Sequence, residues 1–388
     1  MAPSCSRRPQ RRRFANESYD AKVLSETQSW VVATRLGSHG RVTISDVARE
    51  AGVNKGTVSR ALRGVPGVGA STRERIVDAA NRLDFSASQL ATALATGQSK
   101  TVGIVLPTLH SWYFTAVAAG ASEVLSPAGF RVELINLDID SDYLDVDSAD
   151  FRQLFGELGA GRGRHALLFA GTVTVREARH GGFTGSVPAA ASGMPLTSVP
   201  GIFIDHEAGG RLVGEHLLSL GHRRIAVMDG RIPGKNQAGV WANRTAGLQE
   251  VLRACGSEVP PNLIVVPGDC HGEDGERGMR TILASADPLP TAIFCHTDEL
   301  AFGALAVLRQ SGLECPGDIS IAGFDDHPVS RLWGLTTVSQ FAQTQGHLAA
   351  RALIEALGSP DQAADPAPSA ALHVSLITRE TTAPLRQH

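Results

Sequence analysis

Short apolar runs alternate with amphipathic helical patterns along the chain from residue 101 onward. Seven of these runs end in polar residues, glycine or proline: TVGIVLP, FRVELIN, RHALLFAG, RRIAVMDG, LIVVPGD, TAIFCHTD and ISIAGFDD. Buried strands that are separated by helices form parallel βαβ units. The pattern predicts an α/β core of two lobes with doubly wound parallel sheets, in which ligands bind beyond the carboxyl ends of the strands.

A different pattern lies at residues 43–62, TISDVAREAGVNKGTVSRAL, where two amphipathic runs surround Gly52. Thr43 to Asp46 is a capping-box sequence that opens a first helix. Gly52 ends this helix, because a positive φ costs glycine least. Asn54 is suited to cap a second helix. Helical spacing predicts that three apolar side chains of the second helix are buried: Val58, Ala61 and Leu62.

A third helix is predicted after residue 70. Ser71 to Glu74 has the pattern of another capping box. A fourth short helix is predicted over 88–96, and it has too few apolar residues to be stable alone. The inward face of the third helix is expected to consist of Ile76, Val77, Ala80 and Leu83. The three longer patterns together predict a minimal helical bundle.

Charge is distributed unevenly along the chain. Residues 1–100 contain 16 Lys and Arg against 8 Asp and Glu, whereas residues 101–388 contain 20 against 31. A basic head on an acidic body indicates a module that binds a polyanion. The alternative is a solvated basic tail that has no partner.

Composition excludes several other classes of protein. No apolar run approaches the roughly 18 residues that a membrane span needs. The five cysteines are odd in number and show no CxxC spacing, which disfavours a disulfide framework or a zinc site and suits a reducing cytosol. The arginine-rich start lacks the apolar stretch of a secretory signal. We therefore expect a soluble, cytoplasmic protein.

The two helices around Gly52 have the form of a helix-turn-helix, in which the second helix lies in the major groove of DNA. Its exposed early turns carry side chains suited to base edges and phosphates: Asn54, Lys55, Thr57, Ser59 and Arg60. The alternative is an ordinary helical hairpin that packs on another domain.

Several strings resemble the lac-repressor/gal-repressor (LacI/GalR) family of bacterial transcription regulators. They are VTISDVAREAGVNKGTVSRALRG, TRERIVDAANRLDF, FIDHEAGGRLVGEHLLSLGHRRIAVMDG and GDISIAGFDD. The resemblance covers about residues 41–388. It implies a three-helix helix-turn-helix domain and a hinge helix, followed by a two-lobed core like that of periplasmic binding proteins.

The resemblance also implies domain boundaries. The basic extension is 1–40, the helix-turn-helix domain 41–86 and the hinge 87–100. The expected amino-terminal lobe of the core is 101–204 plus 341–371, and the carboxyl-terminal lobe is 205–340 plus 372–388.

By position, the resemblance implies that Lys55 and Gly56 read bases and that Thr57 and Ser59 contact phosphate. Gly56 offers no side chain, so discrimination would rest on Lys55, Arg60 and DNA shape. The hinge would wedge Leu94 into the minor groove and kink the duplex. The full expected DNA-binding set is Thr43, Asn54, Lys55, Gly56, Thr57, Ser59, Arg60, Ser88, Ala91 and Leu94.

The core of this family binds a small effector between its lobes. A sugar site needs an aromatic face together with groups that bond hydroxyls. The candidates by motif match are Tyr113, Phe114, Arg244, Thr297, Asp298 and Asp325. Packing at a helix start, helix caps or a surface ion pair would be the alternative roles of these residues. The segment 171–200 is rich in glycine and alanine and fits the family poorly.

An α/β enzyme is the less favoured alternative. The glycine-rich string GAGRGRH at 159–165 precedes its strand, whereas a dinucleotide-binding loop follows one. The sequence also lacks GxxxxGK[ST], HExxH and GxSxG patterns. We therefore expect no catalytic residue, no cofactor and no metal. A sugar-binding protein without operator control is the other alternative.

The expected function is a repressor of carbohydrate-utilisation genes. A homodimer would bind a near-palindromic operator on double-stranded DNA, because protein two-fold symmetry matches that of the site. A sugar or sugar derivative would alter operator affinity, and no membrane is expected to take part.

Overall fold

A computed structural model describes the residues 42–62, 67–83, 100–137, 164–171, 187–193, 199–230, 239–268, 270–358 and 369–386. The chain divides into two compact units, Met1–Ala91 and Thr92–His388. No helix within the described ranges has the length and apolar character that crossing a membrane requires. The expected extension and hinge helix lie outside the described residues.

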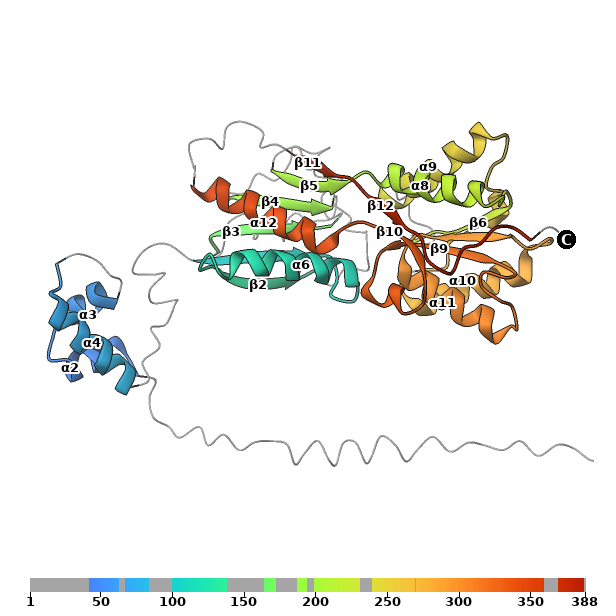
Figure 1. Ribbon diagram of the computed structural model, residues 1–388. Coiled ribbons are helices and arrows are strands. Elements are labelled where there is room, and N and C mark those ends of the chain that lie inside the picture. Colours follow the sequence, from blue (N-terminus) through green and yellow to red (C-terminus); the bar gives the residue numbers. More distant parts are fainter. Residues whose placement is uncertain are drawn as a thin grey trace, which may run out of the picture. The chain divides into compact units, whose positions relative to one another are not determined.

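The first unit contains the helices α2 (Ile44–Glu50), α3 (Lys55–Leu62) and α4 (Ala70–Arg82), drawn in blue in Figure 1. The expected capping box of the first helix is confirmed, since Asp46 accepts a 2.9 Å hydrogen bond from the Thr43 backbone N–H. Gly52 follows α2 with a φ of 65°. The three helices bury one apolar cluster: Val47, Ala48, Ala51, Val58, Ala61, Ile76, Ala79 and Ala80.

Two expectations for this unit were wrong. The third helix begins at Ala70, its N-cap is Gly69, and the Ser71 box does not form. Val77 is 41% exposed and Leu62 is 36% exposed, although both were expected to be buried. Successive helical residues are about 100° apart around the axis, so Val77 points away when Ile76 occupies the narrow core.

The second unit contains two sheets. The first has the strand order β11-β5-β4-β3-β1-β2, and all of its described neighbours are parallel. One face is covered by α6 (Trp112–Leu125) and α12 (Ala342–Gly358), which pack against each other (Figure 1). The strands are β1 (Thr101–Leu106), β2 (Arg131–Asn136), β3 (Ala166–Ala170), β4 (Ala189–Gly193), β5 (Gly201–Ile204) and β11 (Ala370–Leu372).

The second sheet has the order β12-β10-β9-β8-β6-β7. Its edge strand β12 is antiparallel to β10, which departs from the expected all-parallel pairing. The strands are β6 (Ile225–Met228), β7 (Ile264–Val265), β8 (Ala292–Cys295), β9 (Ser320–Asp325), β10 (Thr336–Ser339) and β12 (Ser375–Ile377). Two 3₁₀ turns, η3 (Pro261–Leu263) and η4 (Pro328–Arg331), lie in its connections.

Helices cover both faces of the second sheet. The helices α8 (His206–Ser219) and α9 (Val240–Ala254) pack on one face, and α10 (Gly272–Ser285) and α11 (Asp298–Gln310) on the other. Successive strand side chains point to opposite faces. Ile293 accordingly joins the cluster beneath α10 and α11, whereas Phe294 joins the cluster beneath α8 and α9.

The described segments connect the two sheets three times. The chain crosses between β5 and α8, between β10 and α12, and between β11 and β12. The carboxyl ends of several strands of both sheets therefore meet at the junction of the lobes.

Glycines allow the paired helices to approach closely. A Cβ at Gly247 of α9 would overlap the carbonyl oxygen of Glu207, and one at Gly210 of α8 would overlap that of Arg244. The pairs α6–α12 and α10–α11 show the same reciprocal arrangement, through Gly120 and Gly346 and through Gly275 and Gly303. Each pair is thus packed backbone to backbone.

A buried carboxylate organises the loop after β9. Asp298, the first residue of α11, accepts hydrogen bonds from the His327 N–H at 2.8 Å, the Ser330 hydroxyl at 2.6 Å and the Thr337 hydroxyl at 2.5 Å. Asp298 is fully buried, and this burial raises the pKa of its carboxyl from 3.8 to about 6. The three donors oppose this shift, but the loss of water outweighs them.

We predict that Gly247→Ala lowers the free energy of unfolding by about 1–3 kcal/mol, because the added methyl group forces α8 and α9 apart. Chemical denaturation of the full chain measures this change. The control is Gly272→Ala, whose Cβ would lie 3.8 Å from the nearest backbone oxygen. Equal stability of both variants would contradict the close packing.

We also predict a pH-dependent difference between the wild type and Asp298→Asn. The carboxyl of the folded protein holds its proton up to a higher pH than that of the unfolded chain. Its contribution to stability is therefore complete below pH 3.8 and is lost as the pH rises through about 6. Across this window the wild type should lose about 3 kcal/mol relative to Asp298→Asn.

Denaturation curves at both ends of this window test the difference, and parallel stabilities would contradict the raised pKa. The variant Asp298→Ala should be destabilised at every pH, because it leaves the Ser330 and Thr337 hydroxyls buried without their acceptor.

Candidate functional sites

The start of α3 is fixed by its cap. Asn54 Oδ1 accepts hydrogen bonds from the Thr57 N–H at 2.7 Å and from the Thr57 hydroxyl at 2.9 Å, which confirms the predicted cap. A Cβ on Gly56 would lie 3.3 Å from the same oxygen, so a side chain there would press on the cap. The bare Gly56 thus leaves the cap undisturbed.

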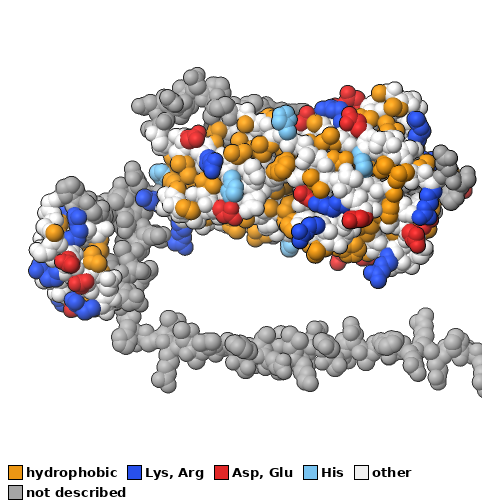
Figure 2. All heavy atoms as spheres, in the orientation of Figure 1, with side chains coloured by type: hydrophobic (Ala, Val, Ile, Leu, Met, Phe, Trp, Pro, Cys, Tyr) orange, Lys and Arg blue, Asp and Glu red, His pale blue; other side chains and the backbone are white. Residues whose placement is uncertain are grey.

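The polar residues predicted to read DNA form an accessible helix face. Asn54, Lys55, Gly56 and Arg60 are exposed, and Thr57 and Ser59 are half-buried. Figure 2 shows Lys and Arg side chains on the visible face of this small helical unit. Thr43 is exposed, and its hydroxyl donates a 2.7 Å hydrogen bond to Asp46. Three further predicted positions lie outside the described residues: Ser88, Ala91 and Leu94.

A cavity of about 100 Å³ lies between the two lobes of the core, where strands of both sheets end. From the first lobe it is lined by residues at or beyond the carboxyl ends of β1, β3 and β4. From the second lobe it is lined by residues of α8 and α9 and by residues at or beyond the carboxyl ends of β7, β8, β9 and β10. Five of the six predicted effector residues line it: Tyr113, Phe114, Arg244, Thr297 and Asp325. Asp298 is not in the lining and takes part in the hydrogen bonds beneath η4.

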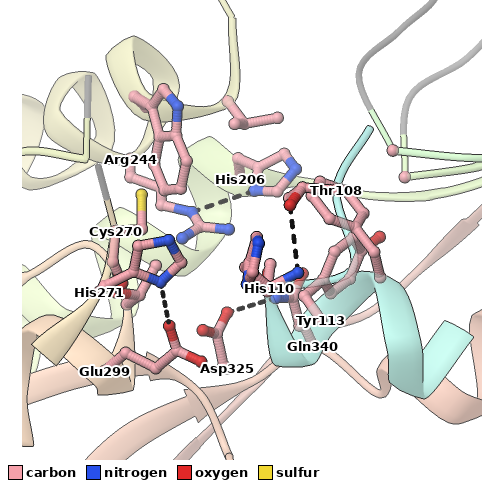
Figure 3. Close-up of a pocket in the computed structure, with 17 residues that line it drawn as sticks. Thr108, His110, Tyr113, His206, Arg244, Cys270, His271, Glu299, Asp325 and Gln340 are labelled. Atoms are coloured by element: carbon pink, nitrogen blue, oxygen red, sulfur yellow. Dashed lines mark hydrogen bonds and ion pairs between the residues drawn. The ribbon is translucent and has the colours of Figure 1, made fainter. Parts of the chain in front are cut away.

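Arg244 is the central cation of the cavity, although it is only 3% exposed. Its guanidinium carbon lies 3.6 Å from the centroid of the Phe324 ring and 4.9 Å from that of Trp241. Its Nε donates to His206 Nδ1 at 3.3 Å, as Figure 3 shows. Burial and the neighbouring Arg244 lower the pKa of His206 well below its usual value, so His206 is neutral and can accept this bond.

Asp325 lies across the cavity from Arg244 (Figure 3). Its carboxylate oxygen accepts a hydrogen bond from the Gln340 side-chain amide. Burial raises the pKa of Asp325 well above its usual value, and Arg244 opposes this shift. Its φ of 138° is unusual for a residue other than glycine. The raised pKa favours the protonated form of this carboxyl group, which can donate as well as accept hydrogen bonds.

The predicted aromatic residues have different surroundings. The Tyr113 hydroxyl donates a 2.9 Å hydrogen bond to Gln345 Oε1, and burial raises the pKa of Tyr113. Phe114 lines the cavity and also belongs to the core of the first lobe. Thr297 caps α11 by accepting the Leu300 N–H at 3.2 Å. Three predicted residues thus combine a place in the cavity with a structural contact.

Several lining residues were not predicted from the sequence. His206, Trp241, Cys270, His271 and Glu299 all line the cavity. Each follows or precedes a strand or helix boundary, but polar residues at such boundaries commonly serve as caps. His206 could have been found because it lies within FIDHEAGG, a string that carries the family resemblance, and Trp241 because it lies three residues before the predicted Arg244.

Side chains of the two lobes meet beside the cavity. The rings of His110 and His271 lie edge to face at 6.3 Å, and His271 Nδ1 lies 3.5 Å from Glu299 Oε2 (Figure 3). Burial raises the pKa of Glu299. His271 and a hydrogen bond from the Trp112 backbone N–H to the Glu299 carboxylate oppose this shift. The Trp112 ring also lies 4.9 Å from the ring of His327.

Among the described residues, no three His, Cys, Asp or Glu side chains lie close enough together to hold a metal ion. The cavity presents a buried cation, a buried carboxyl group, hydroxyl groups and aromatic faces. Such groups bind and orient a small polar molecule.

Comparison with known proteins gives two family matches. Residues 43–88 match the bacterial regulatory proteins of the lacI family, and residues 215–382 match a periplasmic binding protein-like domain. The catabolite control protein A of Priestia megaterium is 30% identical over 317 residues, which cover 80% of this chain and 91% of that protein. The transcriptional repressor PurR of Haemophilus influenzae strain PittEE is 28% identical, with coverage of 82% and 92%.

Solved structures extend the similarity to the whole architecture. The lac repressor dimer bound to operator and the anti-inducer ONPF has a TM-score of 0.72 and is 27% identical, covering 88% of this chain and 99% of its own. A complex of the regulator CelR with cellobiose has a TM-score of 0.61 at 26% identity, with coverage of 88% and 100%. The helix-turn-helix unit, the two-lobed core and these matches agree: the chain belongs to the LacI family of bacterial transcription regulators.

Proposed function

We propose that this regulator is a repressor whose affinity for its operator is set by a small sugar-like effector. A homodimer reads two half-sites of a near-palindromic operator, one with each α3 helix. The protein acts in the bacterial cytoplasm, at the nucleoid, and carries out no catalysis. The observation that carries this proposal is the cavity between the lobes, in a chain that also contains a helix-turn-helix.

The exposed face of α3 supports the proposed DNA contacts. Lys55 and Arg60 are exposed cations on one short helix, and the capped start of that helix presents backbone N–H groups and the positive end of its dipole. Thr57 and Ser59 contact phosphate in this proposal. Thr43 and Asn54 contribute at the margins of the same face, and Gly56 lets the helix approach the bases closely.

The hinge completes the proposed DNA contact. Ser88, Ala91 and Leu94 lie in the minor groove at the operator centre, where Leu94 opens a base step. An apolar wedge unstacks the bases and bends the duplex, which brings more protein surface into contact with it. A short helix of this kind is only marginally stable by itself, so its order can depend on the state of the core.

The lining of the cavity supports a sugar-like effector. Arg244 and Asp325 face one another with groups that bond hydroxyls, while Trp241 and Phe114 supply aromatic surface. The cavity volume of about 100 Å³ is well below the roughly 300–1,000 Å³ of clefts for larger ligands. We therefore favour a small effector, such as a monosaccharide derivative. Asp298 holds the neighbouring loop and does not contact the effector.

We assign one sheet to each proposed lobe, 101–204 plus 341–371 and 205–340 plus 372–388. The strand order supports this assignment except at Leu372, which ends β11 of the first sheet. An effector that binds the two lobes more tightly in one relative pose shifts the population toward that pose. Operator and effector affinities are then coupled through the lobes and the hinge. A binding protein without operator control would show no such coupling.

Lys55→Ala should weaken specific DNA binding by about tenfold or more, because it removes a base contact worth about 1–3 kcal/mol. Selection of binding sequences from a random duplex pool, followed by titration at several salt concentrations, measures this effect. Arg351→Ala removes an exposed cation from α12 and should leave specificity unchanged. If the wild type shows no sequence preference, the proposed function fails.

Ligand control is tested by thermal shift with monosaccharides, disaccharides, polyols and nucleosides. A compound that binds the native state raises the melting temperature by mass action, and the same compound should change operator affinity. Arg244→Met should abolish both responses, whereas Arg351→Met should retain them. A compound that stabilises the protein without changing operator affinity would favour a plain binding protein.

A further inference from the structure

A histidine outside the cavity lining contacts three side chains of α9. His296 directly follows β8 and is fully buried. Its ring stacks on that of Trp241, with centroids 5.9 Å apart and planes 7° from parallel. Its Nε2 lies 3.0 Å from the Thr245 hydroxyl, and its backbone carbonyl accepts a hydrogen bond from Arg244 Nη1. Both the side chain and the backbone of His296 therefore hold this helix.

The three partners lie on one face of α9. Trp241, Arg244 and Thr245 have the spacing i, i+3 and i+4, which places them side by side on a helix. Trp241 and Arg244 line the cavity. The contacts with His296 thus fix the face of α9 that the cavity presents to a ligand.

A carboxylate orients His296 from behind. Asp229 directly follows β6 and is fully buried, and its Oδ1 lies 3.3 Å from His296 Nδ1. The Gly230 N–H also lies 3.3 Å from the same nitrogen. If Nδ1 carries the proton, it donates to Asp229 while Nε2 accepts from Thr245. If Nε2 carries the proton, it donates to Thr245 while Nδ1 accepts from Gly230, but Asp229 then makes no hydrogen bond to the ring. The carboxylate beside Nδ1 therefore favours the first tautomer.

Either tautomer therefore keeps both ring nitrogens bonded and keeps the ring tied to α9. Buried polar groups of this kind are costly unless every one is satisfied, and satisfied networks hold a single arrangement. The side chain has little freedom to rotate, because rotation breaks bonds on both sides and separates the two stacked rings.

We propose that His296, oriented by Asp229, is a positioning residue for the effector cavity. It holds the Trp241 ring and the Arg244 guanidinium in the orientation that a ligand meets, without touching the ligand itself. The inference rests on the proposed function for the presence of a ligand. The orientation of Trp241 can be measured in the free protein.

The experiment compares His296→Ala with His222→Ala in the full chain. His222 is a matched control, because it is also buried and bonded at both ring nitrogens, to the Thr291 hydroxyl and the Ala383 carbonyl, but lies outside the cavity lining. Both variants should lower the melting temperature. A merely structural histidine would do no more than this.

The specific readout is the fluorescence of Trp241, obtained by subtracting the spectrum of the corresponding Trp241→Phe protein from each spectrum. We expect His296→Ala to red-shift this component and to increase its quenching by acrylamide, and His222→Ala to leave it unchanged. His296→Gln can still bond Thr245 through its amide and should restore part of the wild-type signal. An unchanged Trp241 component in His296→Ala would overturn the proposal.

Ligand binding gives the second readout. For whichever compound of the thermal-shift panel stabilises the wild type, His296→Ala should weaken binding by about tenfold, the equivalent of one lost hydrogen bond, and His222→Ala should not. Equal affinity in both variants would overturn the positioning role. If the Trp241 component changes as expected but no compound binds the wild type, the proposed effector class fails and the role of His296 stands.

Discussion

The burial of the Arg244 guanidinium constrains the arrangement of the cavity more than any other interaction. A buried cation costs several kcal/mol unless the protein replaces the water that it loses. Here the replacement comes from the face of Phe324 on β9, from His206 at the start of α8 and from the carbonyl of His296 after β8. The cation can persist only where these elements meet. His206 must stay neutral to accept the Arg244 Nε–H, and burial ensures that it does.

Close packing of the helix pairs fixes the positions of the elements that surround Arg244. Gly210 and Gly247 bring α8 and α9 together backbone to backbone, so His206 and Arg244 are presented from two helices that cannot slide past each other without steric overlap. Close glycine packing also fixes α10 against α11, and with them His271, the N-cap of α10, and Glu299 of α11. Small residues in the helices thus determine where the charged ones lie.

Sequence patterns predicted the elements better than they predicted the cavity. The Asn54 cap, the Gly52 turn and the apolar strands are local features, and they formed as expected. By contrast, β4 is a strand of small residues, AAASG, that is fully buried between its neighbours in the first sheet, a setting that its sequence does not reveal. Asp298 and Asp325 each lie at or just past the end of an apolar strand, yet only Asp325 lines the cavity. The difference arises because Asp298 begins a helix and meets the donors of a neighbouring loop, which no spacing within the sequence encodes.

The three connections between the sheets have a mechanical consequence. With a single connection, one lobe could rotate about the chain in many directions. Three connections prevent free rotation of one lobe against the other, because a rotation about any one of them would stretch the other two. What remains is a narrow set of bends shared by all three. Ligands of different shape would therefore bend the two lobes in the same direction. They would differ only in the size of the bend.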